Sequence, residues 1–244
     1  MTTAHGTSGT SGTEGWQAGV RRRLGLGRLL PLGAAEDSAW LAESAAVGAL
    51  RSAVWAEAGL GRIRVGLADT AGAQPPTGAA PPAPAPPSAL PPGPLRIDAD
   101  FEPGRDEPLP AVAERLRAAL FAHARELGLQ VVRVDLRVTG LRDDDAERAA
   151  RPAQRQTAGS WSPLDPNDVP GVTDVDGVAG LTRALGGGVT DSDGHLRVEL
   201  ATAQGHRPLD VARHVRGALA RVRPEALSVA VVVTGVGVRV DAAE

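Results

Sequence analysis

Apolar and polar positions follow the same order in two separate stretches of this chain. In residues 95–141 the apolar positions recur first at every second residue, then at a spacing near 3.6, then at every second residue again. Residues 196–236 repeat this succession. A period of two is typical of a strand with one buried face, and a period near 3.6 is typical of an amphipathic helix. Each stretch is therefore predicted to form a strand, a helix and a strand.

The two predicted helices can be aligned residue by residue. Placing Val112 opposite Val211 brings two further apolar pairs into register, and both final strands end in Thr-Gly followed by an apolar residue. Self-similarity of this kind indicates an internal repeat, which sets the architecture of a chain. The aligned positions are Val112, Leu116 and Leu120 in the first helix and Val211, Val215 and Leu219 in the second.

A further helix and strand are predicted before the first stretch. Residues 35–58 carry apolar side chains at helical spacing with Asp37 as the N-cap, and residues 61–69 alternate as a strand. Residues 35–141 are therefore expected to form one α-β-β-α-β unit. The apolar stripe of its first helix consists of Trp40, Val47, Leu50 and Val54.

The second unit is expected to span residues 168–244 and to have a shortened first helix. Apolar side chains keep helical spacing from Val175 to Leu185, but three consecutive glycines follow directly and would end a helix. The predicted fold class is thus α+β, with two tandem copies of a small α-β-β-α-β unit. The second copy has the shorter first helix, and the N-terminus is disordered.

Three segments lack apolar periodicity and are expected to lie outside the packed units. Residues 1–15 are rich in Gly, Ser and Thr and are predicted to be a disordered tail. Residues 142–167 are predicted to be a linker. Residues 70–94 hold ten of the chain's 20 prolines, which favour extended polyproline II and cannot donate to a sheet, so this insertion is interpreted as a spacer.

Residues 16–34 form a short apolar segment with glycines among its leucines. One interpretation is a segment that docks on the first unit. The other is an element that binds a partner or a membrane surface, because one or two turns of amphipathic helix are possible here. The candidate partner-binding residues are Trp16, Val20, Leu24, Leu29 and Leu30.

The final strands of the two units differ in their second face. The first strand places Arg133, Asp135 and Arg137 between its apolar residues, so one face is expected to meet water. The second strand is apolar on nearly both faces, as is typical of a strand covered on both sides. We expect its second face to pack against the other unit or another copy of the chain. The candidate self-association residues are Val229, Val231, Val232 and Val233.

Composition excludes several classes of site. The chain has no cysteine, which excludes disulfides, thiolate metal sites and cysteine nucleophiles. A net charge of −3 gives no general attraction to nucleic acid, although all 26 basic residues are arginines. The N-terminus has no signal-peptide pattern, and no run reaches the ~20 apolar residues of a membrane span. We therefore expect a cytoplasmic protein, without a span of its own.

The polar clusters of the chain do not predict an active site. Three acidic clusters, at residues 143–145, 174–176 and 191–193, lack the ligand spacing of a calcium loop. Asp193-Gly194 is instead interpreted as the turn between two strands. The five histidines show neither metal-ligand spacing nor a nucleophile motif. The sequence therefore predicts no enzyme, no metal site and no cofactor.

Several short segments resemble one known family. Gly205–Ala212 enters the second unit's long helix, Leu227–Val229 leads to Thr234–Val236, and Val169–Val172 forms a turn. Together with the order of elements, these segments resemble the alkaline-shock, envelope stress-response family of Gram-positive bacteria. Leu24–Gly33 is similar to actinobacterial relatives, some of which carry a nucleopolyhedrovirus p-ten label.

The resemblance implies a non-enzymatic scaffold in the cell-envelope stress response. Such a protein would work at the cytoplasmic face of the membrane, where it would form homo-oligomers and bind related stress-family proteins. A membrane-anchored envelope protein would hold it there. The alternative is an RNA-binding module, because small α/β units of this kind resemble KH-type domains. Against that alternative, the chain has no Gly-x-x-Gly clamp with basic flanks and almost no aromatic residues, so no nucleic acid is expected.

Overall fold

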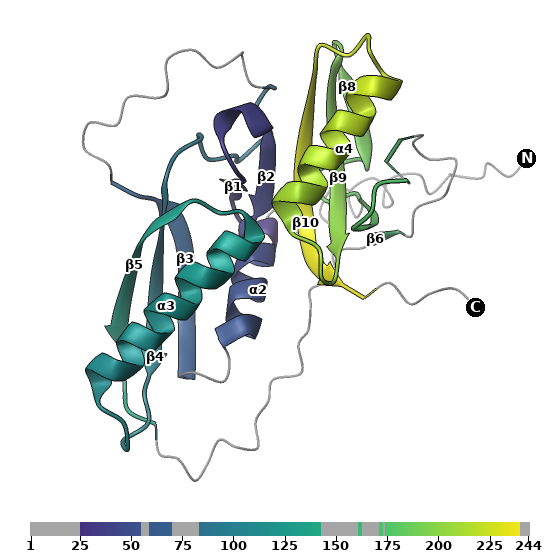
Figure 1. The fold of residues 1–244 in the computed structure, drawn as a ribbon. Helices are drawn as coiled ribbons and strands as arrows, with labels where there is room; N and C mark the ends of the chain where they lie inside the picture. Colours follow the sequence, from purple (N-terminus) through teal and green to yellow (C-terminus); the bar gives the residue numbers. More distant parts are fainter. Residues whose placement is uncertain are drawn as a thin grey trace, which may run out of the picture.

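The computed structural model describes most of the chain outside its N-terminal tail and connecting segments (Figure 1). The described residues form a mixed α+β fold with three α-helices and two mixed sheets. The first half of the protein is the part before residue 143, and the second half is the part after residue 160. The described residues are 25–54, 59–69, 83–142, 161–162, 171–172 and 174–239.

The smaller sheet has three strands in the order β3-β4-β5. Strand β4 (Leu95–Glu102) pairs antiparallel with β3 (Gly59–Leu67) and parallel with β5 (Val131–Val138). Helix α3 (Leu109–Leu127) makes the crossover and ends at Gly128, which takes the left-handed conformation common after helix C-termini. The strand, helix and strand predicted for residues 95–141 are therefore present.

The larger sheet has the order β1-β2-β10-β9-β7-β6, with β8 also paired to β9. Its first two strands are β1 (Leu29–Pro31) and β2 (Ala39–Ala42). Its β9 pairs antiparallel with β8 and parallel with β10, and α4 connects β9 to β10, so the predicted strand, helix and strand are present here too. These pairings match those around α3 in the smaller sheet. The bounds are β6 (Trp161–Ser162), β7 (Val178–Thr182), β8 (Val189–Ser192), β9 (His195–Ala203), α4 (Pro208–Val222) and β10 (Ser228–Val238).

The helix predicted for residues 35–58 is wrong in its first third. A 3-10 turn, η1 (Ala35–Asp37), leads into strand β2 (Ala39–Ala42), and α2 (Glu43–Val54) begins only after that strand. All four residues of β2 are buried, and β2 pairs parallel with β10 of the second half. A short apolar run that is covered on both faces has no period of its own, so it resembles the start of a helix.

The shortened helix predicted for residues 175–185 is also wrong. Strand β7 occupies this position and pairs antiparallel with β9. Its residues from Ala179 to Thr182 are all buried, so both faces of the strand are covered. The stretch between Gly177, which has φ 88°, and the glycines after Leu185 is long enough for a five-residue strand. A helix confined to the same stretch would be only marginally stable.

Part of the N-terminal segment is built into the larger sheet. Strand β1 (Leu29–Pro31) pairs antiparallel with β2 and forms the edge of that sheet. Leu29, Leu30 and Leu32 are at most 1% exposed. A docked segment, the first of the two interpretations of residues 16–34, therefore describes these residues.

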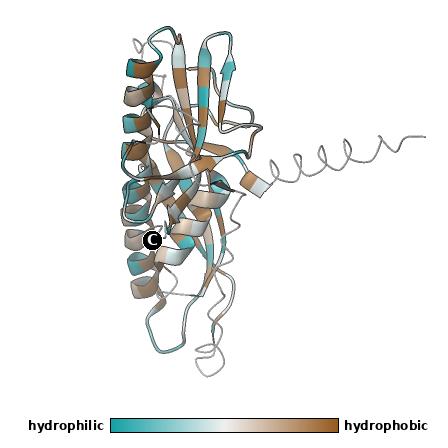
Figure 2. Ribbon diagram, turned by 90° about the vertical axis from the view of Figure 1, so that its right-hand side faces the viewer, coloured by the Kyte–Doolittle hydropathy of each residue, from teal (hydrophilic) through white to brown (hydrophobic). Residues whose placement is uncertain are grey.

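One continuous core joins the two halves. Helices α3 and α4 lie on the same side of the two sheets in Figure 1, and the turned view in Figure 2 shows helices along one edge of the molecule. Beneath them, apolar side chains from both sheets and all three helices form a single buried cluster. A second, smaller cluster covers the opposite face of β2 and β10, around Trp40, Ala230 and Val232.

A buried carboxylate lies on that opposite face. Glu199, in the middle of β9, is fully buried, and its Oε2 accepts a 2.7 Å hydrogen bond from the backbone N–H of Leu185. Arg197 Nη2 lies 3.6 Å from Oε1 without a hydrogen bond. Burial raises the pKa of Glu199, because the bond from Leu185 and the charge of Arg197 offset only part of the lost hydration.

Candidate functional site

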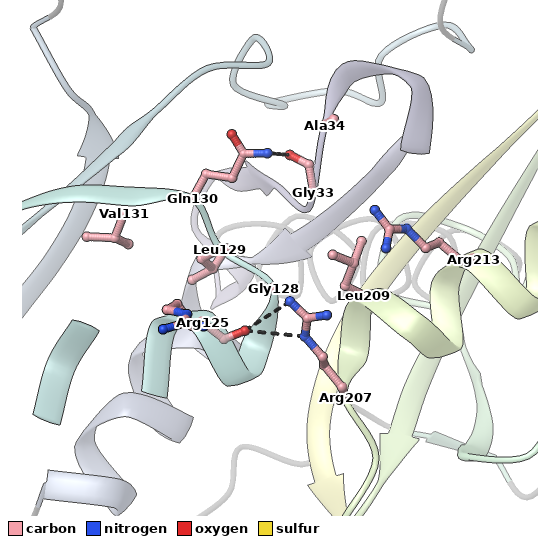
Figure 3. Close-up of a pocket in the computed structure, with 10 residues that line it drawn as sticks. All are labelled: Gly33, Ala34, Arg125, Gly128, Leu129, Gln130, Val131, Arg207, Leu209 and Arg213. Carbon is pink, nitrogen blue, oxygen red and sulfur yellow. Dashed lines mark hydrogen bonds between the residues drawn. The ribbon is translucent and has the colours of Figure 1, made fainter. Parts of the chain in front are cut away.

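A pocket of about 290 Å³ opens where the two halves meet (Figure 3). Its walls come from three places: the turn after β1, the C-terminal end of α3 and the N-terminal end of α4. The lining residues are Gly33, Ala34, Arg125, Gly128, Leu129, Gln130, Val131, Arg207, Leu209 and Arg213.

Arg207 joins the two long helices across this pocket. Its Nε and Nη2 donate to the backbone carbonyl of Arg125 at 3.3 and 3.2 Å, as the dashed lines in Figure 3 show. This carbonyl lies in the last turn of α3, where a helix leaves carbonyl groups without intrahelical donors and favours positive charge. Arg207 therefore caps the C-terminus of α3 from the start of α4.

The turn after β1 closes the opposite wall of the pocket. Gln130 Nε2 donates to the carbonyl of Gly33 at 3.0 Å, and the Gly33 N–H donates to the carbonyl of Gly128 at 3.0 Å. Gly33 has φ 78°, and a Cβ there would lie 2.2 Å from Asp37 Oδ2. Only glycine fits this position without a shift in the surrounding atoms.

Asp37 is a buried charged residue at the place where the two halves meet. It is 6% exposed, and it accepts hydrogen bonds from Arg213 and from the N–H of Ala34. Burial alone would raise its pKa. The hydrogen bonds from Arg213 and Ala34, together with the charges of Arg213 and Arg216, outweigh burial and lower the pKa of Asp37 below its usual value.

The chemistry available in the pocket is hydrogen-bond donation. Its polar side chains are the guanidinium groups of Arg125, Arg207 and Arg213 and the amide of Gln130. Arg207 and Arg213 already bind acceptors that belong to the protein. The arrangement therefore holds the two halves together, and its outer donors can bind water or an anionic group.

The two edges of the smaller sheet differ in how they are covered. At the outer edge of β3, Arg28 Nη2 donates to the carbonyl of Val65 at 2.6 Å and Arg51 Nη2 donates to that of Gly61 at 2.8 Å. At the outer edge of β5, one long bond of 3.4 Å joins Arg117 Nε to the carbonyl of Val134. No strand in the described part of the chain pairs with the outer edge of β3 or of β5. Because the outer edge of β5 carries one long bond where that of β3 carries two short ones, we call it the open edge of this sheet.

The charged face predicted for β5 is confirmed. Side chains of Arg133 and Asp135 are 67% and 42% exposed, and Arg133 Nε lies 2.7 Å from Asp135 Oδ2. The register with β4 places Asp98 beside Asp135 and Asp100 beside Arg137. This face of the sheet therefore carries charged side chains of both signs up to the open edge.

The residues predicted to mediate self-association lie inside the fold instead. Val232 stands between Trp40 of β2 and Glu199 of β9, and its side chain packs in the smaller apolar cluster. The second face of β10 is thus covered from within the same chain, because Leu26, Ala83 and Leu185 belong to the same buried cluster as Val232. This prediction is corrected for all four residues: Val229 is 7% exposed, and Val231, Val232 and Val233 are fully buried.

The predicted partner-binding residues divide into two groups. Leu29 and Leu30 are buried in the core, so their side chains are not available to a partner in this fold. Trp16, Val20 and Leu24 lie outside the described residues.

The described acidic clusters and histidines form turns, hydrogen bonds and ion pairs within the fold. Asp193-Gly194 forms the predicted turn between β8 and β9, where the Gly194 N–H donates to Asp191 Oδ1 at 3.0 Å. His206 Nε2 lies 3.8 Å from Asp176 Oδ1. The 143–145 cluster lies outside the described residues. Across the ranges that are described, no three His, Asp or Glu side chains gather as a metal site.

The lengths and the hydropathy of the described helices limit whether one of them could span a membrane. None of them combines the length and the apolar character needed to cross a bilayer.

Comparison with protein-family models, with curated proteins and with solved structures found no match to this chain.

Proposed function

We propose that this chain is a non-enzymatic scaffold protein of cell-envelope stress response and homeostasis. In this proposal it self-associates at the cytoplasmic face of the membrane, where a membrane-anchored partner holds it. The proposal takes its context from the resemblance of the sequence to the alkaline-shock family.

The matching strand pairings around α3 and α4 support a duplicated unit. In both halves an antiparallel pair is followed by a helix and a parallel strand, and the aligned helix positions are all buried. We propose that residues 59–138 and 189–238 descend from one β-β-α-β unit. On this view the second copy has strand β7 where the first has helix α2. The aligned residues are Val112, Leu116 and Leu120 in α3 and Val211, Val215 and Leu219 in α4.

The observation that carries the scaffold proposal is the open edge of β5. An edge strand presents a row of backbone N–H and C=O groups that can pair with another strand. The edges of the larger sheet are occupied by short strands, and the outer edge of β3 is covered by Arg28 and Arg51. Strand β5 therefore offers an eight-residue edge that has no strand partner in the described part of the chain and carries one long side-chain bond.

Membrane fractionation of cells that express the full chain tests this function. We expect the chain to float with membranes in a density gradient and to return to the supernatant when the anchored partner is deleted. Purified chain should not bind protein-free vesicles, because attachment is through a protein. Two results would contradict the scaffold function: a chain that stays in the supernatant of wild-type cells, or salt-sensitive retention on RNA, which would favour the KH-like alternative.

A further inference from the structure

The backbone of β5 directs its alternate residues to its two edges. Thr139 donates its N–H to the carbonyl of Phe101 in β4. In a parallel ladder, the N–H and C=O of one residue point to the same side and those of the next residue point to the other. Arg133, Asp135 and Arg137 therefore bond toward β4, whereas Val134, Leu136 and Val138 direct their backbone groups to the open edge. The Arg117 bond to the Val134 carbonyl agrees with this assignment.

We propose that two copies of this chain pair through β5, antiparallel, about a two-fold axis at Leu136. The two three-stranded sheets would then form one six-stranded sheet. This inference rests on the proposed function, since it names the surface and the partner of the self-association.

The charges of β5 favour this register over the one with the axis at Asp135. With the axis at Leu136, each Asp135 faces Arg137 of the other copy in a non-hydrogen-bonded pair, where side chains approach most closely. With the axis at Asp135, like charges would meet, because Asp135 would face itself and Arg133 would face Arg137. Opposite charges in cross-strand pairs stabilise a sheet, and like charges destabilise it.

A third register, with the axis at Val134, would also bring opposite charges together, since Asp135 would face Arg133 of the other copy, but it is less favourable for Arg137. It would place Arg137 opposite Val131 and would leave that guanidinium without an acceptor. In the structure Arg137 makes no ion pair or side-chain hydrogen bond with any described residue, whereas Arg133 already holds Asp135. The axis at Leu136 gives Arg137 an acceptor and leaves the Arg133–Asp135 pair in place.

The inner face of β5 fits the same register. Val134 would face Val138 of the other copy, and Leu136 would face its own equivalent, so only apolar side chains meet on the helix-covered face. Val138 is 40% exposed in the single chain and would be covered by pairing. The Val134 carbonyl has a second lone pair for the new strand, and the 3.4 Å bond from Arg117 is long enough to yield.

Sedimentation velocity of the full chain with reversed charges tests the register. We expect the wild type to reach twice the 25.0 kDa mass of one chain as concentration rises. Asp135→Arg and Arg137→Asp should each weaken dimerisation by about tenfold or more, because each creates two like-charged pairs. The double variant Asp135→Arg/Arg137→Asp restores opposite charges and should recover the dimer. Arg64→Asp, on the same face of β3, is the matched control and should sediment as the wild type does.

The outcomes separate this inference from the scaffold function. A wild type that stays at 25.0 kDa at every concentration, or single and double variants that dimerise alike, would overturn pairing through β5. In either case membrane flotation of the wild type would still support the scaffold. Conversely, the chain could form a dimer with the expected charge dependence and yet never float with membranes. That result would support pairing through β5 and would contradict the scaffold function. Circular dichroism spectra of all variants establish that each is folded.

Discussion

Arg213 and Asp37 form a two-pronged ion pair across 176 residues of sequence: Nε and Nη2 of the arginine donate to the two carboxylate oxygens at 2.8 and 3.0 Å. The pair joins α4 to the turn that leads into β2. Strand β2 also pairs with β10. The ion pair and the β2–β10 ladder therefore both hold β2 and the turn before it against the second half.

Asp37→Asn should lower the free energy of unfolding by about 1–3 kcal/mol. The substitution leaves Arg213 without its charged acceptor, at a position where the carboxylate is 6% exposed. Chemical denaturation followed by tryptophan fluorescence measures the difference. Asp210→Asn is the control, since Asp210 is about half exposed and its pairs with Arg207 and Arg213 are long, so its loss should stay within about 0.5 kcal/mol.

The contribution of Asp37 should also depend on pH. Its pKa is lower in the folded chain than its usual 3.8, so the stabilisation is complete above 3.8 and is lost as pH falls through the folded pKa. The difference in unfolding free energy between wild type and Asp37→Asn should therefore narrow below pH 3.8. A difference that stays constant through acid would show that the ion pair is not its source.

The contribution of Glu199 to stability should depend on pH in the opposite direction to that of Asp37, and Glu199→Gln tests this. The pKa of Glu199 is raised above 4.5 in the folded chain, so the stability linked to it is fully present below 4.5 and is lost as pH rises through the folded pKa. The glutamine keeps an acceptor for the Leu185 N–H and carries no charge. Relative to wild type, the variant should therefore gain stability as pH rises above 4.5, in urea titrations at a series of pH values. Parallel curves for the two proteins would contradict this assignment.

Gly128→Ala should destabilise the chain by more than about 1 kcal/mol. Gly128 has φ 92°, and a Cβ there would lie 2.4 Å from Leu209 Cβ of the other half. Gly217→Ala, in the middle of α4, is a matched control, because a Cβ at that position meets nothing within 4 Å. Alanine should stabilise that helix by about 0.5–1 kcal/mol. Equal effects of the two substitutions in thermal unfolding would argue against the packing of Leu209 on Gly128.

Local periodicity is sufficient to predict the strand-helix-strand core of each half. Leu116 and Val215 lie on amphipathic helices whose buried faces depend only on spacing, and both are fully buried. Strands β2 and β7 cannot be predicted in this way, because both are short and covered on both faces. Their identity depends on pairing with β10 and β9, and β10 lies far from β2 along the chain.

The candidate sites depend on contacts that the sequence does not display. The sequence pattern favours Asp37 as a helix N-cap, and nothing near it in sequence indicates Arg213. The charges of β5 are predictable as a solvent-facing set, but its place at the edge of the sheet depends on the strand order β3-β4-β5. The burial of β10 is predictable too, whereas its pairing with β2, and that of β2 with β1, follows from the docking of the N-terminal segment.

Cysteine cross-linking at the proposed axis tests the pairing of β5 most directly. The chain has no cysteine of its own, so Leu136→Cys introduces one thiol per copy. Paired residues at the axis have Cα atoms about 5.5 Å apart, within the range of a disulfide. Val131→Cys is the control, because five residues from the axis at about 3.3 Å each place its two copies some 33 Å apart. The account predicts a disulfide-linked dimer for Leu136→Cys and not for Val131→Cys under mild oxidation. Monomers in both, or equal cross-linking in both, would contradict it.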